Sequence, residues 1–243
     1  MSSEATKVIE RVHGRLKVFT SNLDKSLTEG NVADKGIGIP YIMQARESGN
    51  YGLVVNGAIG YLQVKYAVWK NPELDHTVDG LEIFYSKLKK AHIGREDEMV
   101  QMAQNYITTH SLRSTVEIMQ DFPSRFLVTS NGSSVAQAAV RTYKMVNFIS
   151  NEDIFGEDGL ISGVKVNIRD GEDKVKGLHD MLKGFSIELK DCVYVGDSKV
   201  DVPVMQLVGF PIASPFATDE VKGYAHFILT DKSLINPQEL IRR

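Results

Sequence analysis

The sequence has a single cysteine, Cys192, among 243 residues, so the chain cannot form an internal disulfide. This favours a reducing, cytoplasmic location, and the apolar neighbours of Cys192 favour a buried thiol. The first residues lack the uninterrupted apolar run and small-residue cleavage site of a signal peptide. We therefore expect a cytoplasmic protein with a structural cysteine.

An excess of charge of one sign is also lacking. The formal net charge is −3 and 24% of the residues are charged, which gives no reason to expect nucleic acid or an acidic membrane as a partner. The most apolar long stretch, Tyr51–Trp69, contains Asn56, Gln63 and Lys65, each costly at a bilayer centre. We interpret it as a buried helix or pocket wall. Nothing in the sequence indicates an oligomeric state.

Apolar runs that end in polar loops predict the strands of a parallel sheet. They are continuous rather than alternating, as in strands covered on both faces. Helical patterns at 133–145 and 172–185 separate them, so the alternation predicts a doubly wound α/β core. A hairpin is expected near 156–167, with Asp158 and Gly159 in its turn. The four apolar runs are Arg15–Asn22, Ser124–Ser134, Lys190–Ser198 and Gly209–Pro215.

The stretch from 31 to 110 has a different character. It offers helical patterns at 77–92 and 95–110 but few convincing strands. We therefore predict an α/β core made of residues 1–30 and 111–243, with a mostly helical cap at 31–110 inserted after the first strand.

Chemistry-bearing side chains follow several of the predicted strands. In an open α/β sheet, ligands bind beyond the carboxyl ends of the strands. The second strand leads into a helix near Ser133 whose free N–H groups favour an anion. Hydroxyls, a lysine and that helix start predict a phosphate cradle, and clustered carboxylates suit Mg²⁺. The side chains are Asn22, Asp24 and Ser26, then Thr129, Ser130 and Asn131, then Lys174, and finally Asp197 and Asp201.

These residues resemble the four motifs of the haloacid dehalogenase superfamily, most closely its phosphoserine-phosphatase-like branch. "NLDKSLT" is similar to the first motif, usually Asp-x-Asp-x-(Thr/Ser/Val), and "LVTSN" to the second. Lys174 stands where the third motif has its lysine, and "GDSKVDVPVM" is similar to the fourth. Each motif alone is weak, but four in order are specific. The resemblance implies a Rossmann-like core with a cap, and a magnesium-dependent phosphatase, a hydrolase of phosphate monoesters.

The resemblance also implies roles for the phosphate-handling residues. Position 22 would be the nucleophile that forms an aspartyl phosphate. Asp24 would protonate the leaving alkoxide and then activate water as general acid and base. Ser130 and Lys174 would act on the transferring phosphoryl group, and Asn131 would join them in binding phosphate.

A magnesium site is implied beside the phosphate. Its ligands would be the side chain of Asn22, the backbone carbonyl of Asp24 and the carboxylate of Asp197. Asp201 would lie outside the ligand set and orient Lys174 or metal-bound water.

The chain departs from the family at the attacking residue, because Asn22 is an amide where the motif has aspartate. An amide is a poor nucleophile, so we expect this form to be strongly impaired. Two histories fit: an inactivated or substrate-trapping form of an enzyme, or a natural non-catalytic protein that binds phosphate ligands. Retention of the other motif residues favours the first.

The substrate is expected to be a small phosphorylated metabolite. Phosphoserine phosphatases carry a glutamate nine residues beyond the nucleophile, where this chain has Asn31, with Glu29 two residues short of it. This argues against phosphoserine. Residues available to line a polar pocket are Tyr41, Arg46, Tyr51 and Asn56.

A signalling receiver domain is the rival from another class. It also combines aspartate, hydroxyl and lysine on a parallel sheet, but its acidic pair lies at the first strand and its lysine follows the hydroxyl strand. Here the acidic "GDSKVD" follows Lys174, and the chain is twice the expected size.

Overall fold

The computed structural model describes residues 1–52 and 94–241, together with positions 54, 55, 59, 82, 83, 85, 86, 88 and 89 between them. The interpretation of Tyr51–Trp69 as a buried helix and the helix predicted at 77–92 therefore lie largely outside the described residues. Within the described part of the chain, no helix is both long and apolar enough to cross a membrane.

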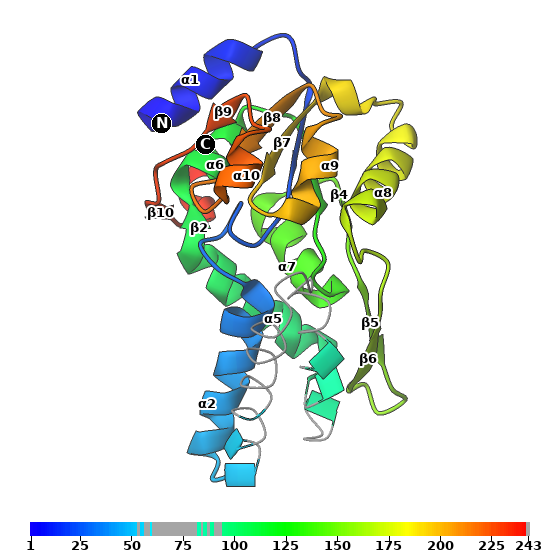
Figure 1. Cartoon of the computed structure of the whole chain (residues 1–243). Helices are drawn as coiled ribbons and strands as arrows, with labels where there is room; N and C mark the ends of the chain where they lie inside the picture. The colour runs from blue at the N-terminus through cyan, green and yellow to red at the C-terminus, as the bar shows by residue number, and fades with distance from the viewer. Residues whose placement is uncertain are drawn as a thin grey trace.

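A parallel six-stranded sheet forms the centre of the molecule (Figure 1). Its strand order is β4-β3-β1-β7-β8-β9. The first strand, β1, therefore lies between β3 and β7, which come from the second and third of the predicted apolar runs. All the strands predicted from apolar runs are present, and the predicted doubly wound α/β fold is confirmed. The strands are β1 Val18–Ser21, β3 Ser124–Val128, β4 Asn147–Ile149, β7 Cys192–Gly196, β8 Phe210–Ala213 and β9 Phe227–Ile228.

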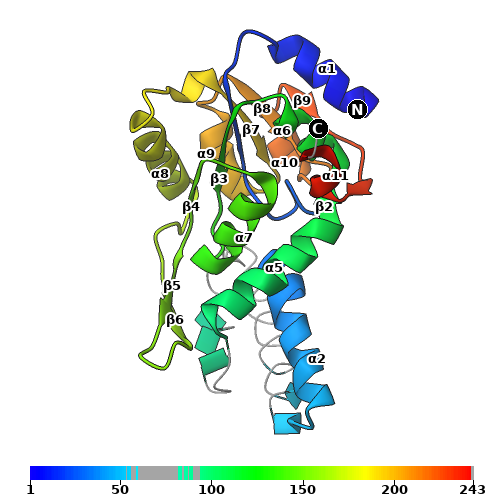
Figure 2. The ribbon, with the colours of Figure 1, turned by 180° about the vertical axis from the view of Figure 1, so that it is seen from behind.

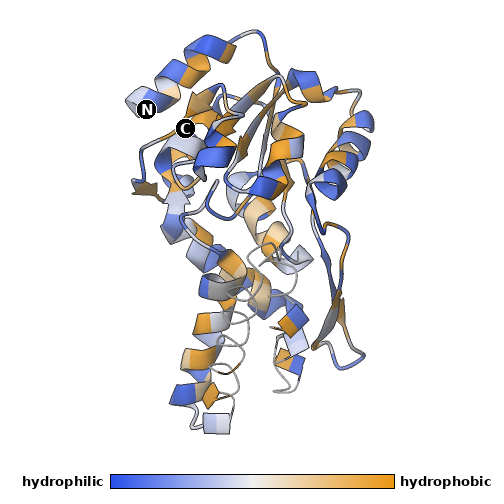
Figure 3. Ribbon diagram, viewed as in Figure 1, coloured by the Kyte–Doolittle hydropathy of each residue, from blue (hydrophilic) through white to orange (hydrophobic). Residues whose placement is uncertain are grey.

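Helices cover both faces of this sheet, which explains why its strands are mainly apolar. Alternate side chains of a strand point to opposite faces: Val18 packs with α8, α9 and α10, whereas Phe19 packs with α1, α6 and α7. Hydrophobic and hydrophilic residues share the surface of α1 and of α8 (Figure 3). The helices around the sheet are α1 Ser3–Val12, α6 Arg113–Gln120, α7 Ser133–Tyr143, α8 Gly171–Lys183, α9 Val202–Met205 and α10 Asp219–Lys222.

The described part of the predicted cap consists of helices beyond the carboxyl ends of the strands (Figure 1). The helix predicted at 95–110 is present as α5 Glu96–His110, and it packs along α7 (Figure 2). It is preceded along the chain by the π-helical turn η1 Ala33–Gly38 and by α2 Ile39–Glu47. The division into a core and a cap with the predicted boundaries stays a prediction.

The expected hairpin is present, and it begins earlier than the sequence pattern indicates. Strands β5 Glu152–Phe155 and β6 Ile161–Lys165 pair antiparallel, and Gly159 in their turn has a left-handed φ of 73°. The hairpin extends to the same side of the sheet as α2 and α5 (Figure 1). The remaining elements are β2 Ser111–Leu112 paired with β10 Leu234–Ile235, the short turns η2 Leu189–Asp191 and η3 Lys199–Asp201, and α11 Pro237–Ile241.

Candidate functional site

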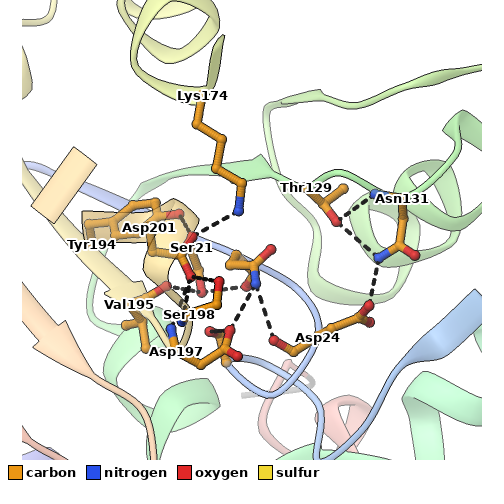
Figure 4. Close-up of polar contacts among 12 residues, drawn as sticks. Ser21, Asp24, Thr129, Asn131, Lys174, Tyr194, Val195, Asp197, Ser198 and Asp201 are labelled. Atoms are coloured by element: carbon orange, nitrogen blue, oxygen red, sulfur yellow. Dashed lines mark hydrogen bonds and ion pairs between the residues drawn. The ribbon is translucent and has the colours of Figure 1, made fainter. Parts of the chain in front are cut away.

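The first part of the site is the loop that follows β1. The backbone N–H of Asn22 donates to the carbonyl of Val195, so the loop leaves the sheet beside β7. Lys25 then adopts a left-handed φ of 55°, and the N–H of Leu27 donates back to the carbonyl of Leu23. This tight turn brings Asp24 into the polar network of Figure 4, and the Asn22 side chain contacts both Asp24 and Asp197.

The Asn22 side chain joins two segments of the site. Its Nδ2 donates to Oδ1 of Asp197 at 2.9 Å and to the backbone carbonyl of Asp24 at 3.2 Å. The hydroxyl of Ser26 donates to the same Asp197 oxygen at 3.1 Å. Because both partners of the amide are acceptors, the amide must present its NH₂ group to them, which fixes its orientation.

Asp24 is held in place by two donors. Oδ1 accepts from the backbone N–H of Val32 at 2.9 Å, and Oδ2 accepts from Nδ2 of Asn131 at 3.0 Å. Burial raises the pKa of Asp24 to about 6, although these hydrogen bonds and the charge of Lys174 oppose the rise. A carboxyl group with such a pKa can carry a proton near neutral pH, as a general acid requires.

At the end of β3, the network runs through Thr129 and Asn131. Nδ2 of Asn131 donates to the hydroxyl of Thr129 at 3.0 Å as well as to Asp24, and the backbone N–H of Asn131 donates to the same hydroxyl. The carbonyl of Ser130 accepts from Asn151, and no side-chain hydrogen bond joins Ser130 to Asp24 within the described residues. Thr129 is the first residue after β3. Its position after the predicted strand is the sequence signal that placed it among the candidate residues beside Ser130.

Lys174 and Asp201 form a buried ion pair between α8 and η3. Nζ of Lys174 lies 2.8 Å from Oδ1 of Asp201, which also accepts from the hydroxyl of Tyr194 at 2.6 Å. Oδ2 accepts from the backbone N–H groups of Asp197 and Ser198. Burial acts to raise the pKa of Asp201, but the charge of Lys174 and these hydrogen bonds outweigh it, and the pKa is lowered. Asp201 contacts Lys174 directly, and its role in orienting that lysine stays a prediction.

Asp197 lies between this ion pair and Asn22. Burial, followed by the negative charge of Asp201, raises the pKa of Asp197 to about 7, whereas the Asn22 hydrogen bond and the charge of Lys174 lower it. Within the described chain, Asp197 therefore lies near both the amide and the lysine. Asp197 therefore connects Asn22 with the ion pair of Lys174 and Asp201.

A carboxylate of the protein binds at the start of α7, where the sequence pattern predicts an anion site. The backbone N–H of Ser134 donates to Oδ2 of Asp153 at 2.7 Å, and the hydroxyl of Ser133 accepts from the Asp153 backbone N–H. The hydroxyl of Tyr85 donates to the other oxygen of Asp153. The Asp153 carboxylate thus occupies one backbone N–H group of this helix start, and phosphate binding beside it stays a prediction.

Of the predicted pocket-lining residues, the three that the structure describes make no side-chain hydrogen bond to this network. Tyr41 donates to Glu98 on α5 at 3.2 Å, and Arg46 and Tyr51 are exposed. Asn56 lies outside the described residues. Asn31 directly precedes Val32, whose N–H binds Asp24, so that position lies beside the site.

The side chains predicted to hold magnesium lie together, but they do not fit the ion in this arrangement. The Asn22 amide donates to both of the other predicted ligands, the Asp24 carbonyl and the Asp197 carboxylate. Asp197 is the only predicted ligand with a negative charge. No cluster of three or more His, Cys, Asp or Glu side chains suited to a metal occurs among the described residues.

Comparisons with known proteins agree with this geometry. Residues 164–234, which include Lys174 and the "GDSKVD" loop, match the haloacid dehalogenase-like hydrolase family. The chain is 23% identical over 119 residues to phosphoserine phosphatase of Haemophilus influenzae, and 30% identical over 93 residues to phosphoglycolate phosphatase 1 of Saccharolobus solfataricus. These matches cover 49% and 38% of the chain, and span about two fifths of each relative, 38% and 40%.

The fold is shared over nearly the whole chain. A substrate-bound phosphoserine phosphatase structure superposes with a TM-score of 0.63, at 17% sequence identity, covering 95% of this chain and 99% of the other. The resemblance predicted from the four motifs is therefore confirmed: the chain is similar in sequence to haloacid dehalogenase-like hydrolases and has the α/β fold of their phosphoserine-phosphatase-like branch.

Proposed function

We propose that this chain binds a small phosphate monoester at the carboxyl ends of β1, β3 and β7, and that Asn22 strongly impairs its hydrolysis. The observation that carries this proposal is the meeting of all four motifs in one buried network. Asn22 contacts Asp197 across 175 residues of sequence, and Asp24 contacts Asn131 across 107. The similarity to phosphatases supports the same function class.

Lys174 supplies the positive charge for the phosphate. Its ammonium group has three N–H donors. Among the described residues it has one hydrogen bond, to Asp201, which leaves two donors for phosphate oxygens. Desolvated charge-assisted hydrogen bonds of this kind are stronger than neutral ones. Thr129, Ser130 and Asn131 add hydroxyl and amide groups at the end of β3.

Asp24 is suited to act on the ester oxygen of the substrate. With a pKa raised to about 6, it holds a proton over part of the near-neutral range and can donate it to a leaving alkoxide. Val32 and Asn131 fix the direction of its carboxyl group from both sides.

The missing function is the attack on phosphorus. In the covalent route, a carboxylate oxygen forms a bond to phosphorus while the bond to the alkoxide breaks, and water later releases the phosphate. The neutral amide oxygen of Asn22 is a weak nucleophile and gives no stable phosphorylated product. We therefore expect an aspartate at position 22, with Mg²⁺ to offset the phosphoryl charge, to be needed for turnover.

The substrate is proposed to be a small phosphorylated metabolite. The relatives are named for phosphoserine and phosphoglycolate, both small phosphorylated acids. Asn31, beside the site where glutamate would read the phosphoserine amine, argues against phosphoserine. A cytoplasmic location stays a prediction.

A natural binding protein without catalysis is the second candidate, and one observation favours it. The Asn22 amide makes two hydrogen bonds whose polarity a carboxylate could not reproduce, because both partners are acceptors. A carboxylate at position 22 would instead face the Asp197 carboxylate, unless a cation lay between them.

The discriminating experiment restores aspartate. The chain and Asn22→Asp are compared for phosphate release from a panel of phosphomonoesters, including phosphoserine and phosphoglycolate, with Mg²⁺ present. Asn147→Asp, an exposed position on β4, provides the matched control for the same chemical change. We expect hydrolysis by Asn22→Asp alone, faster by roughly 10⁴- to 10⁶-fold. If all three proteins bind the esters but none hydrolyses them, the binding-protein candidate stands; no binding to any of them rejects the proposed function.

A further inference from the structure

The hydrogen bonds of the Asn22 amide connect the groups that the motifs imply as metal ligands. Three oxygen donors to a metal are implied by the motifs: the side chain at position 22, the Asp24 carbonyl and an Asp197 oxygen. In this chain the last two oxygens accept from one nitrogen, Nδ2 of Asn22, at 3.2 and 2.9 Å. The side chain at position 22, itself an expected ligand, therefore supplies the partial positive charge that binds the other two oxygens.

The polarity of the amide makes this arrangement self-consistent. Both hydrogens of the NH₂ group are used, one on each oxygen, so neither oxygen is left without a donor. Asp197 also accepts from Ser26 at 3.1 Å. Asn22 and Asp197 are each 7% exposed, and the donors of the protein satisfy Oδ1 of this carboxylate.

A divalent cation would have to break this network to bind. The amide would need to turn its oxygen toward the metal, which separates two hydrogen bonds, and Asp197 would be the only anionic ligand. Magnesium loses its water reluctantly and is usually held by one or two carboxylates. This chain offers it a single carboxylate, Asp197, and binding would also break the two hydrogen bonds of the Asn22 amide.

We propose that the Asn22 amide takes the place of the divalent cation, so that this site holds no metal and binds its phosphate ligand without one. The second part rests on the proposed function, whereas the first does not. The charge balance is consistent with a weaker anion site: a carboxylate with a divalent cation contributes one net positive charge, and the amide contributes none. Lys174 is then the main cation for the phosphate.

The metal part is tested with manganese alone. Mn²⁺ is titrated into the chain, Asn22→Asp and the double variant Asn22→Asp/Asp197→Asn, and bound metal is read by electron paramagnetic resonance without any phosphate. We expect one bound ion in Asn22→Asp, which is lost in the double variant. Binding to the Asn22 chain should be at least about tenfold weaker, since loss of even a partner outside the ligand set typically costs about 10- to 100-fold in metal affinity. Comparable affinity in the Asn22 chain, or no bound ion in folded Asn22→Asp, overturns the proposal.

A second measurement uses the unaltered chain, since Asn22→Asp places two carboxylates together and could fold poorly. Thermal unfolding of the Asn22 chain is followed with EDTA and with excess Mg²⁺. A ligand that binds only the folded state raises its stability, so an unchanged melting temperature supports the proposal. A rise that disappears in Asp197→Asn overturns it.

The phosphate part uses calorimetry with inorganic phosphate in EDTA and in Mg²⁺. For the Asn22 chain we expect affinities within about twofold of each other, whereas a metal-coupled site changes by about 5- to 150-fold. Phosphate binding that requires Mg²⁺ overturns the inference and leaves the proposed function standing. Absence of phosphate binding in both buffers rejects the metal-free phosphate site together with the proposed function, and the manganese titration still decides the first part.

Discussion

Nζ of Lys174 lies 2.8 Å from Oδ1 of Asp201, with 1% and 0% of the two side chains exposed. Removing one partner leaves the other charge buried and unpaired, which typically costs about 3–5 kcal/mol. We expect Lys174→Met to lower the free energy of unfolding by about this amount in urea titrations. Lys176→Met, an exposed lysine on the same helix, should change stability by less than about 0.5 kcal/mol. Equal stability of both variants would contradict the buried ion pair.

Asp24 should matter for the chemical step once a nucleophile is restored. In the Asn22→Asp background, the further change Asp24→Asn keeps the shape of the side chain but removes the transferable proton. We expect a loss of about 10²- to 10⁴-fold in the rate of phosphate release, typical of general acid–base catalysis. Substrates with good leaving groups, such as aryl phosphates, should lose less than alkyl phosphates. The same loss for both substrate classes would argue that Asp24 does not protonate the leaving group.

Gly132 should tolerate no side chain. A Cβ atom there would lie 1.9 Å from Oδ1 of Asp153 and 2.2 Å from the hydroxyl oxygen of Tyr85. The resulting displacement of the carboxylate that caps α7 is expected to make Gly132→Ala less stable by about 1–3 kcal/mol or more. Gly163→Ala on β6, where a Cβ would meet no atom within 4 Å, is the control. Chemical denaturation of both variants measures the difference, and a stable Gly132→Ala protein would contradict the packing.

Cys192 should be unreactive in the native protein. Burial, together with the charge of Asp191, raises the pKa of its thiol to about 12, and the side chain is fully buried. Because the thiolate is the reactive form, its population stays small from pH 7 to 9. We expect slow reaction with a thiol reagent over this range and fast reaction in denaturant, where an ordinary pKa near 8.5 returns. Fast native-state labelling that rises around pH 8 would show an exposed thiol.

The sequence by itself determined the strands and the order of the motifs. A strand buried on both faces is mainly apolar, so β1, β3, β7 and β8 can be located as apolar runs ending in polar loops. Because parallel strands end at the same edge, the residues at those ends could be expected to meet. Asp24, Asp197 and Asp201 were identified in this way, whereas Lys174 was identified from the resemblance to the third motif. The shortest strands of the six-stranded sheet, β4 and β9, have too few residues to form a pattern.

The tertiary structure alone decided which of these residues contact one another and with what polarity. Asp153 reaches the start of α7 from the hairpin, 19 residues beyond Ser134, and no local spacing indicates that it caps this helix. The link between Asn22 and Asp197 spans 175 residues and depends on how β1 and β7 pair. Sequence spacing fixes where a side chain leaves its strand, whereas its hydrogen-bond partner depends on the packing of segments that are distant in the chain. For this reason the sequence identified Asn22 as the departure from the family, and only the fold gave its amide two acceptors.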